Sequence, residues 1–240
     1  MMFREEMEKA SEEYGIHLTG QQKGQLGMYY RLLMEWNQKM NLTAITEPHE
    51  VAVKHMVDSL SALDEKSFPE NGSVIDVGTG AGFPGIPLKI LRPDLNMVLL
   101  DSLNKRISFL QAIVETLRLE HTECIHGRAE ELARDEAYRE AFDVAVSRAV
   151  AKLSVLSEYC LPFVKQGGVF IALKGRQYRE EMKEAQRAVK TLGGGDVESR
   201  EVHLPGLDDK RAVISIHKIS ATPKTYPRKA GTPERNPIGV

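Results

Sequence analysis

Val74-Ile-Asp-Val-Gly-Thr-Gly-Ala-Gly-Phe-Pro-Gly85 combines an apolar strand with a glycine-rich turn that follows it directly. The glycines at 78, 80 and 82 lack a Cβ atom, so they can adopt positive φ and let the turn backbone approach a ligand closely. Such a turn between a strand and a helix is typical of nucleotide-binding α/β proteins. The stretch therefore predicts an α/β fold with a nucleoside-like ligand at the end of this strand. The structural alternative is a ligand-free turn that Asp76 merely caps.

The glycine spacing and the neighbouring acids indicate which cofactor the turn would bind. Dinucleotide sites usually have the spacing G-x-G-x-x-G and hold a pyrophosphate, whereas this chain has G-x-G-x-G. The anionic Asp76 would repel a pyrophosphate but suits a cationic or zwitterionic group, such as the methionine part of S-adenosylmethionine. Asp101 ends the next apolar run, where its carboxylate can accept hydrogen bonds from both ribose hydroxyls. The pattern looks like that of class I methyltransferases and disfavours the alternative of an NAD-dependent oxidoreductase.

The composition is that of a globular α/β protein without a membrane segment. Of the 240 residues, 42% are hydrophobic and 28% are charged, which suits one large domain with a small helical extension. No apolar run approaches the ~20 residues needed to span a bilayer, and the N-terminus lacks the apolar core of a signal peptide. We therefore expect a cytoplasmic protein with no membrane partner. Cys124 and Cys160 have no partner at metal-ligand spacing, so both are expected to be buried free thiols and no metal site is predicted.

Hydrophobic periodicity divides the chain into a helical extension at 1–63, a domain of alternating strands and helices at 64–220 and a basic, proline-punctuated tail at 221–240. The likeness of the glycine turn to class I methyltransferases implies that 64–220 is a Rossmann-like methyltransferase domain. In the extension, Gly15 ends a first helix, Thr19 is the expected N-cap of a second, and Thr46 and Pro48 open a third. Apolar residues recur at helical spacing in the second helix, which we expect to pack against the main domain, and in the third. They are Leu26, Tyr29, Tyr30, Leu33 and Trp36, followed by Val53, Met56, Val57 and Leu60.

Apolar runs predict seven strands, with helical segments between the first six. The strands are expected at 73–77, 96–101, 122–126, 142–147, 168–174, 197–204 and 211–219. The alternation implies a doubly wound sheet. Only residues 205–210 separate the last two strands, too few for a parallel crossover, so these strands should form an antiparallel hairpin at one sheet edge. The predicted fold is therefore the Rossmann-like, seven-stranded class I methyltransferase fold with an N-terminal helical extension.

Cations follow three of the predicted strands. Ligands of such sheets bind outside the carboxyl ends of the strands, and Arg128, Arg148 and Lys174 come after the third, fourth and fifth strands. Their convergence favours a polyanionic substrate, although each alone can be a surface salt-bridge partner. The tail can likewise follow a phosphate backbone or remain a solvated segment without a partner. Its charged residues are Lys224, Arg228, Lys229, Glu234 and Arg235.

The residues near the strand ends limit the chemistry of methyl transfer. Transfer from a sulfonium is an in-line displacement, so the protein must chiefly align nucleophile, methyl carbon and sulfur. An adenine amine would require an Asp/Asn-Pro-Pro-aromatic turn at 147–150, where this chain has Ser-Arg-Ala-Val. Attack by cytosine C5 needs a catalytic cysteine, which neither Cys124 nor Cys160 suits. A ring nitrogen with a free lone pair, such as guanine N7, needs no base and is compatible with a rim of Arg and Lys.

Sequence blocks outside the glycine turn carry a more specific resemblance. They are Trp36-Asn37, Asn41-Leu-Thr-Ala-Ile45, Lys54-His-Met-Val-Asp-Ser-Leu60, Asp101-Ser-Leu-Asn-Lys-Arg-Ile-Ser-Phe-Leu110, Gly127-Arg-Ala-Glu130, Ser147-Arg-Ala149 and Tyr226-Pro-Arg-Lys-Ala-Gly-Thr-Pro233. Over nearly its whole length the chain resembles the bacterial small-subunit ribosomal RNA guanine-N7 methyltransferases, long called glucose-inhibited division protein B. The resemblance implies that S-adenosylmethionine methylates N7 of the guanine at position 527, in the decoding-region loop of 16S rRNA.

The resemblance, joined to the analysis of the turn, also implies roles for single residues. Arg148 would lie where cofactor and target base meet, and it would act in catalysis. The cofactor-binding residues would be Asp76, Gly78, Gly80, Phe83, Asp101, Ser102, Leu103, Ala129, Glu130 and Arg148. The RNA-binding residues would be Arg128, Lys174, Arg228, Lys229 and Arg235.

The implied partner is 16S rRNA or the small ribosomal subunit, including an assembly intermediate of it, and a monomer is expected. The alternative function is a non-catalytic RNA-binding factor for ribosome assembly that retains a nucleoside pocket.

Overall fold

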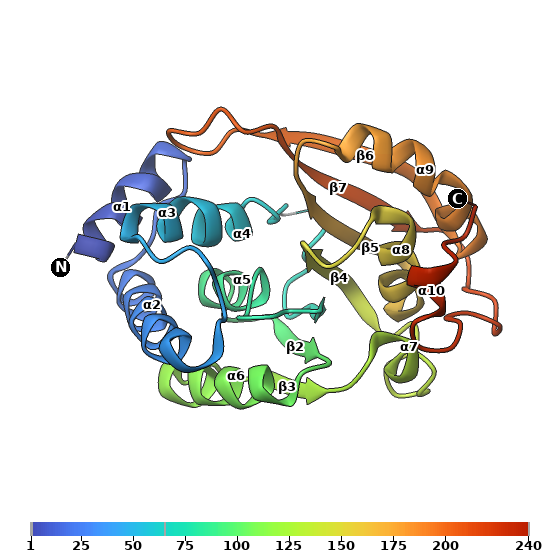
Figure 1. The fold of residues 1–240 in the computed structure, drawn as a ribbon, viewed down its shortest axis with the longest axis horizontal. Helices are drawn as coiled ribbons and strands as arrows, with labels where there is room; N and C mark the ends of the chain where they lie inside the picture. The colour runs from blue at the N-terminus through green and yellow to red at the C-terminus, as the bar shows by residue number, and fades with distance from the viewer. Residues whose placement is uncertain (1, 65, 240) are drawn as a thin grey trace.

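A computed structural model, which describes residues 2–64 and 66–239, has a seven-stranded sheet with helices on both faces (Figure 1). The strands are β1 (Ser73–Val77), β2 (Asn96–Asp101), β3 (Thr122–His126), β4 (Phe142–Arg148), β5 (Val164–Lys174), β6 (Gly194–Val202) and β7 (Arg211–Lys218). Their order in the sheet is β3-β2-β1-β4-β5-β7-β6. Neighbours among β1 to β5 are parallel, while β7 is antiparallel to both β5 and β6. The predicted fold class is confirmed.

The predicted strands and hairpin are present, with differences at the ends of the last four strands, which are a single residue in β4 and β7. β5 begins at 164 rather than 168, and β6 spans 194–202 rather than 197–204. Both strands begin with a shift in pairing register. In β5 the shift follows the pair of Val164 with Phe142 of β4, and in β6 it follows the pair of Gly194 with Lys218 of β7. Such bulges add residues that do not follow the two-residue alternation, so hydrophobic periodicity does not reveal them. The second strand of the hairpin, β7, lies next to β5 and leaves β6 at the edge of the sheet.

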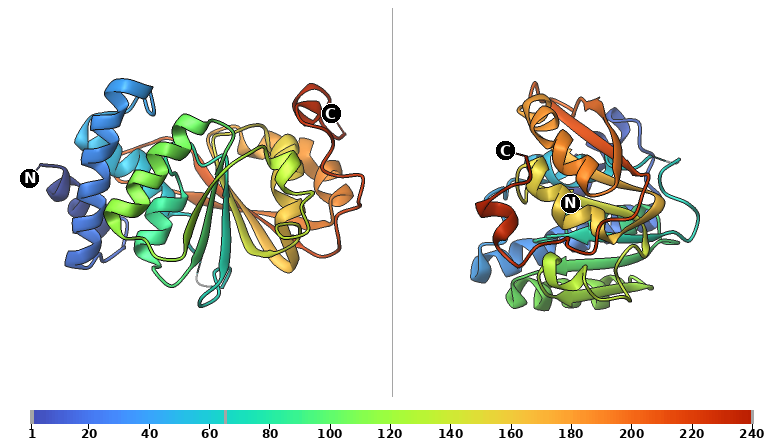
Figure 2. Two further views of the ribbon diagram at one scale, coloured as in Figure 1. Left: turned by 90° about the horizontal axis from the view of Figure 1, so that it is seen from below. Right: turned by 90° about the vertical axis from the view of Figure 1, so that its right-hand side faces the viewer.

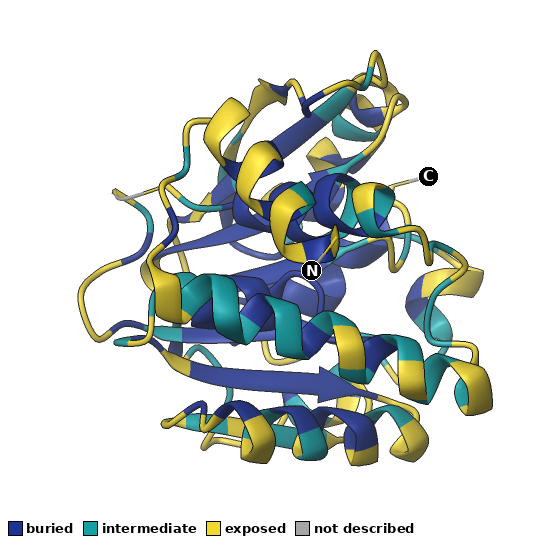
Figure 3. Ribbon diagram, turned by 90° about the vertical axis from the view of Figure 1, so that its left-hand side faces the viewer, coloured by how far each residue is buried: buried dark blue, intermediate teal, exposed yellow. Residues whose placement is uncertain are grey.

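The two faces of the sheet bury separate hydrophobic cores. Helices α5 (Gly85–Leu91) and α6 (Asn104–Leu117) cover one face, and α8 (Leu153–Cys160) and α9 (Tyr178–Thr191) cover the other (Figure 2). Side chains alternate in direction along a strand, so Val74 faces the first core and Ile75 the second. Figure 3 shows the sheet as a buried layer beneath helices whose outer surfaces are exposed. No helix within the described ranges is long and apolar enough to cross a membrane.

The N-terminal helices extend the first core. Helix α1 (Met2–Glu13) ends before Gly15, which has a φ of 88°, and α2 (Gly20–Met40) begins after Thr19. Thr19 is the predicted N-cap: its hydroxyl accepts from Gln22 N at 3.2 Å, while the Gln22 side chain accepts from Thr19 N at 2.8 Å. This reciprocal arrangement is a capping box. Of the predicted apolar face of α2, Leu26, Tyr29 and Leu33 are buried, and Tyr30 and Trp36 are partly buried.

The third predicted helix is divided into α3 (Pro48–Val51), the π-helix η1 (Ala52–Val57) and α4 (Asp58–Leu60). Pro48 is in the first turn as predicted, but the N-cap residue is Glu47 and not Thr46. The Thr46 carbonyl instead accepts a hydrogen bond from the Tyr30 hydroxyl at 3.1 Å. Single π-turns are frequent at functional sites, because they change the direction in which side chains leave a helix. The predicted apolar residues Val53, Met56, Val57 and Leu60 are buried.

The tail is folded against the domain and is not a solvated segment. Arg139 Nη2 donates to the Thr222 carbonyl at 2.8 Å, and its Nη1 donates to the Tyr226 carbonyl at 2.9 Å. Pro227 and Pro233 are buried, and a short helix, α10 (Thr232–Arg235), packs beside α8 (Figure 1). The remaining short helices are α7 (Ala129–Leu132) and the 3-10 helix η2 (Leu161–Phe163). The tail therefore belongs to the same folded body as the sheet.

Thr19→Ala should lower the free energy of unfolding by about 1 kcal/mol, because the variant lacks the acceptor for Gln22 N at the start of α2. In a chain of this size, that loss corresponds to a fall of roughly 2–4 °C in melting temperature. Thr19→Ser retains the hydroxyl and serves as the control. Thermal melts followed by circular dichroism test the capping box, and equal melting temperatures for the two variants would contradict it.

Candidate active site

The carboxyl ends of the parallel strands border two adjoining hollows. The tail-side hollow has a volume of about 160 Å³ and includes Ala129, Glu130, Tyr159, Gly231 and Glu234 in its lining. The helix-side hollow has a volume of about 380 Å³ and includes Thr43, His55, Gly80, Phe83, Arg106 and Arg148. Gly78, Asp101, Ser102 and Val150 line both hollows. A further hollow of about 480 Å³ lies beside the C-terminal ends of α5 and α6, near the residues that precede β2 and β3 and away from the glycine turn.

The glycine turn forms the boundary between the two hollows. Gly78 has a φ of 73°, and a Cβ atom there would lie 2.6 Å from Val150 Cγ2, so a larger residue would be both strained and in collision. The amides of Gly78 and Thr79 donate to the Leu100 carbonyl at 2.9 and 3.0 Å, which ties the turn to β2. At Gly80 a Cβ atom would have no neighbour closer than 4.0 Å. The turn is therefore tightly packed at its start and open to the hollows in its middle.

Asp76 lies beneath the turn and lines neither hollow. Its side chain is completely buried; Oδ2 accepts from Thr79 Oγ1 at 2.6 Å and from Gly85 N at 2.8 Å, while Oδ1 has no partner. Loss of hydration raises the pKa of this carboxyl to about 7, although the two hydrogen bonds act in the opposite direction. In the structure Asp76 holds the turn, so a direct contact between Asp76 and a cofactor stays a prediction.

Asp101 is the acidic group that faces the hollows. Its Oδ1 accepts from Leu103 N at 2.9 Å, and its Oδ2 accepts from Gly80 N at 2.9 Å and from Arg106 Nη1 at 3.2 Å. A carboxylate can accept about four hydrogen bonds, so Oδ1 retains capacity for another donor. Leu103 itself lines neither hollow, and its side chain is 52% exposed. The structure thus gives Leu103 a backbone contact with Asp101 and no contact with the hollows.

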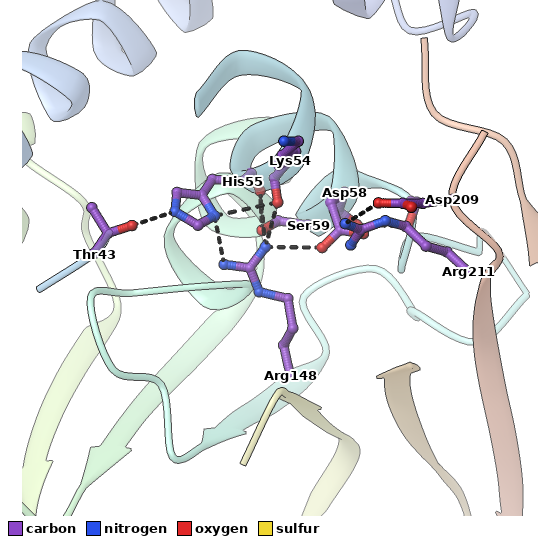
Figure 4. A network of polar contacts seen from close by, with 9 residues as sticks. Thr43, Lys54, His55, Asp58, Ser59, Arg148, Asp209 and Arg211 are labelled. Carbon is purple, nitrogen blue, oxygen red and sulfur yellow. Dashed lines mark hydrogen bonds and ion pairs between the residues drawn. The ribbon is translucent and has the colours of Figure 1, made fainter. Parts of the chain in front are cut away.

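Arg148 enters the helix-side hollow from the end of β4 and is held by the π-helix η1 (Figure 4). Its Nη1 donates to Asp58 Oδ2 at 2.9 Å and to the Lys54 carbonyl at 3.1 Å. The guanidinium also lies 4.8 Å from the centre of the Phe83 ring, a distance at which a cation–π contact is favourable. Asp58 is buried and also accepts from Arg211 at the start of β7, at 3.2 Å. The guanidinium of Arg148 therefore has a fixed position, and only 13% of its side chain is exposed.

His55 is a site residue to which the sequence interpretation gave no role. Its ring stacks on Phe83 with 4.6 Å between ring centres, and Nδ1 lies 3.3 Å from Arg148 Nη2. Nδ1 also lies 3.2 Å from the Lys54 carbonyl, which can only accept, and Nε2 lies 2.7 Å from Thr43 Oγ1, so both ring nitrogens have a partner in either neutral tautomer (Figure 4). Burial, followed by the nearby Arg148 charge, lowers the pKa of His55 to about 3. The signal in the sequence is the polar trio His55, Asp58 and Ser59, spaced as one helical face within an apolar run.

The five predicted RNA-binding cations divide into paired and exposed groups. Lys174 Nζ contacts Glu181 Oε2 at 2.7 Å with only 7% of its side chain exposed, and Arg228 pairs with the buried Glu158. Arg128, at the tail-side hollow, is exposed, as are the remaining two, which are Lys229 and Arg235. Contacts of all five with RNA remain predictions, but the charges of Lys174 and Arg228 are neutralised within the fold.

Cys124 and Cys160 are free thiols, as predicted; Cys160 is buried and Cys124 is half-buried. Burial raises the pKa of Cys124 to about 11 and also raises the pKa of Cys160, so neither is a ready thiolate nucleophile. Across the described ranges 2–64 and 66–239, no group of three or more His, Cys, Asp and Glu side chains is arranged to hold a metal ion.

Comparison with known proteins gives a match over most of the chain. A family model described as rRNA small subunit methyltransferase G (GidB) matches residues 22–213. Ribosomal RNA small subunit methyltransferase G from Alkaliphilus metalliredigens is 54% identical over 227 residues, which cover 95% of each chain. The protein of the same name from Alkaliphilus oremlandii is 50% identical over 238 residues, covering 99% of this chain and 100% of that protein. A crystal structure of a SAM-dependent methyltransferase from Aquifex aeolicus has a TM-score of 0.54 at 17% identity, covers 73% of this chain and 96% of that one, and shows the same fold.

Asp76→Asn should stabilise the protein at and above neutral pH. The folded carboxyl keeps its proton up to a pKa of about 7, whereas the unfolded chain releases it near 3.8, so the free energy of unfolding falls as the pH rises through this window. Asparagine keeps an oxygen acceptor for Thr79 and Gly85 without the buried charge. The variant should therefore exceed the parent in free energy of unfolding by an amount that grows between pH 3.8 and about pH 7 and is constant above that range. The difference should reach a few kcal/mol at most.

Urea unfolding at pH values on both sides of this window measures the effect. Asp208→Asn, at an exposed aspartate between β6 and β7, controls for the change in net charge. A stability difference that does not vary with pH would contradict the assignment of a proton to Asp76.

Proposed function

The chain belongs to the rRNA small subunit methyltransferase G (GidB) family, and we propose on this basis that it transfers a methyl group from S-adenosylmethionine to N7 of a guanine in 16S rRNA. The observation that carries the proposal is the pair of hollows that adjoin at the glycine turn. The tail-side hollow is lined by Glu130, Tyr159 and the tail, and the helix-side hollow by His55, Phe83 and the fixed guanidinium of Arg148, so the two hollows suit different parts of the reactants.

The residues at the hollows fit the cofactor. Gly80 leaves the turn open, and Asp101 Oδ1 retains capacity for a ribose hydroxyl. The tail-side hollow, with Ala129 and Glu130, would take the adenine, while Gly78 and Phe83 would border the methionine part. Asp76 would contribute mainly by fixing the shape of the turn. When bound, the cofactor supplies a methyl group on a positively charged sulfur.

The helix-side hollow suits a nucleophile that already has a free lone pair. His55 is neutral, and both of its ring nitrogens are already engaged, Nδ1 with Arg148 or the Lys54 carbonyl and Nε2 with Thr43, so it has no free nitrogen lone pair with which to remove a proton. Guanine N7 needs no general base, because methylation at this nitrogen does not require loss of a proton. Arg148 would orient the base by donating to its O6 or to an adjacent phosphate, which leaves the N7 lone pair free to attack the methyl group. Guanidinium stays protonated and would repel the sulfonium, so it would act on the base and not on the cofactor.

The RNA would approach over the exposed cations next to the hollows. Arg128, Lys229 and Arg235 lie on the surface, and we infer that they contact phosphates. Lys174 and Arg228 would contribute to the same surface through the segments that they hold in place. We propose 16S rRNA or the small ribosomal subunit as the substrate, a monomeric enzyme, and the cytoplasm as its location, because that is where small subunits are assembled.

Mapping of N7-methylguanine in 16S rRNA tests the proposed function. RNA from cells that lack the gene should lose one N7-methylguanine, detected by borohydride and aniline cleavage or by mass spectrometry. A gene copy with Gly78→Arg should fail to restore it, because the new side chain would enter the space that both hollows share. Gly167→Arg is the matched control: Gly167 has a φ of 87° and is exposed near the start of β5, where a Cβ atom would have no neighbour within 4 Å. An unchanged methylation pattern in the deletion strain would favour the non-catalytic assembly factor.

Arg148→Ala should lower the single-turnover rate of methyl transfer by roughly 30- to 1,000-fold, as expected when an oriented charged contact is lost from a desolvated site. The dissociation constant for S-adenosylmethionine should change much less, because Arg148 would act on the target base. The rate is measured on 16S rRNA and normalised to folded protein, with calorimetry for the cofactor.

Arg211→Ala is the control for loss of structure. Arg211 binds the same Asp58 carboxylate from the side of β7, but it is not part of the lining of either hollow. Its variant should be destabilised and keep a rate within a few-fold of the parent. Equal rate losses in the two variants would indicate that Arg148 has only a structural role.

A further inference from the structure

The C-terminal tail is fixed to the domain by a buried ion pair. Arg228 donates from Nη2 to Glu158 Oε2 at 2.6 Å and from Nε to Glu158 Oε1 at 2.9 Å, and the Arg228 backbone amide donates to the same Oε1 at 2.7 Å. Glu158 is on α8, with only 1% of its side chain exposed. A carboxylate so fully removed from water is stabilised only when it is paired, so this contact fixes where the tail crosses α8.

Beyond this ion pair, the tail reaches the tail-side hollow. Gly231 N donates to Glu130 Oε1 at 2.9 Å, and Glu130 is itself buried. Gly231 and Glu234 line the hollow together with strand-end residues such as Asp101 and Ala129. One wall of the hollow is therefore made by residues more than a hundred positions from the glycine turn in sequence, because the tail folds back across α8.

Arrangement of charge supports a role for the tail at the hollow. The guanidinium of Arg228 points to Glu158 and is neutralised there, whereas Lys229, its neighbour in sequence, is exposed. Two more arginine side chains hold the backbone of the tail: Arg134 Nη2 donates to the Pro227 carbonyl at 2.6 Å, and Arg139 donates to the Tyr226 carbonyl. A tail that served only as a phosphate contact would not need this number of buried donors and acceptors.

We propose that the tail is a wall of the adenosine end of the cofactor site, and that Arg228 and Glu158 are positioning residues that hold this wall against Glu130. The proposal rests on the proposed function, since it assigns the tail-side hollow to the adenosine of S-adenosylmethionine. Residues 226–235 then act on the cofactor before any RNA is present. Glu130 receives its backbone donor from the tail, so a displaced tail leaves this buried carboxylate without that donor and opens the hollow to water.

Arg228→Ala in the full-length protein tests the proposal, with Lys224→Ala, at an exposed cation of the tail outside 226–235, as the matched control. Calorimetry should show that the dissociation constant of the Arg228 variant for S-adenosylmethionine is about 10-fold higher than that of the parent, or more, because the wall is no longer held in place before binding. The same increase is expected for 5′-methylthioadenosine, which has the adenosine but not the amino-acid part of the cofactor. Lys224→Ala should leave both constants within twofold of the parent.

Amide hydrogen exchange on the parent protein provides a second test, which does not require the Arg228→Ala variant to fold. Addition of 5′-methylthioadenosine should slow exchange of the amides in 226–235, including the Gly231 amide that donates to Glu130. The role of the tail would be overturned if 5′-methylthioadenosine bound without slowing amide exchange in 226–235. It would also be overturned if a folded Arg228 variant had the same dissociation constants as the parent. A parent protein that binds neither ligand would contradict the proposed cofactor, and with it the assignment of the wall.

Discussion

A buried carboxyl group beneath the glycine turn determines the geometry of the whole site. Asp76 binds Thr79 near the start of the turn and Gly85 at its end, so one side chain joins the two ends. A Cβ atom at position 85 would lie 2.8 Å from this carboxylate and 2.5 Å from Leu99, so the approach is possible only with glycine. Phe83 lies within the closed turn, and its ring supports both His55 and the guanidinium of Arg148. The aromatic wall of the helix-side hollow therefore depends on a desolvated group that destabilises the fold when it is charged.

A second buried acid connects this wall to the rest of the molecule. Asp58 is on the short helix that follows the π-turn, and it binds Arg148 from β4 and Arg211 from β7. The N-terminal helices are thus part of the site, because the side chain of His55 and the carbonyls of η1 surround the guanidinium in the hollow. Arg211 also contacts Asp209, at 3.9 Å, so two carboxylates balance the two guanidinium groups. Asp58 therefore joins β4, β7 and the N-terminal helices at the wall of the hollow.

Local patterns in the sequence were sufficient for the fold and for the position of the glycine turn. This turn, Asp101 and the ends of β1, β2 and β3 follow from spacing and alternation, because each of them is determined by neighbours in sequence. Thr19 was identified for the same reason, since a capping box involves residues three positions apart. The bulges that begin β5 and β6 leave no periodic signal, and their strand ends were placed incorrectly. The roles of His55 and Asp58 were missed because their partner, Arg148, is about ninety residues away in sequence.

Among the predicted RNA-binding residues, the sequence did not reveal which cations are already paired with carboxylates within the fold. Composition gives the sign of a side chain but not whether the fold already uses it, and the two basic residues Lys174 and Arg228 have buried or half-buried carboxylate partners. The Arg228–Glu158 pair, together with Arg134 and Arg139, holds against the domain a proline-punctuated segment that composition alone describes as a solvated tail. Proline contributes to this order by limiting the conformations of the unfolded tail, so that fewer contacts are needed to hold it. Attraction of a polyanion then depends on the cations that remain exposed, while the paired cations determine the shape that the polyanion meets.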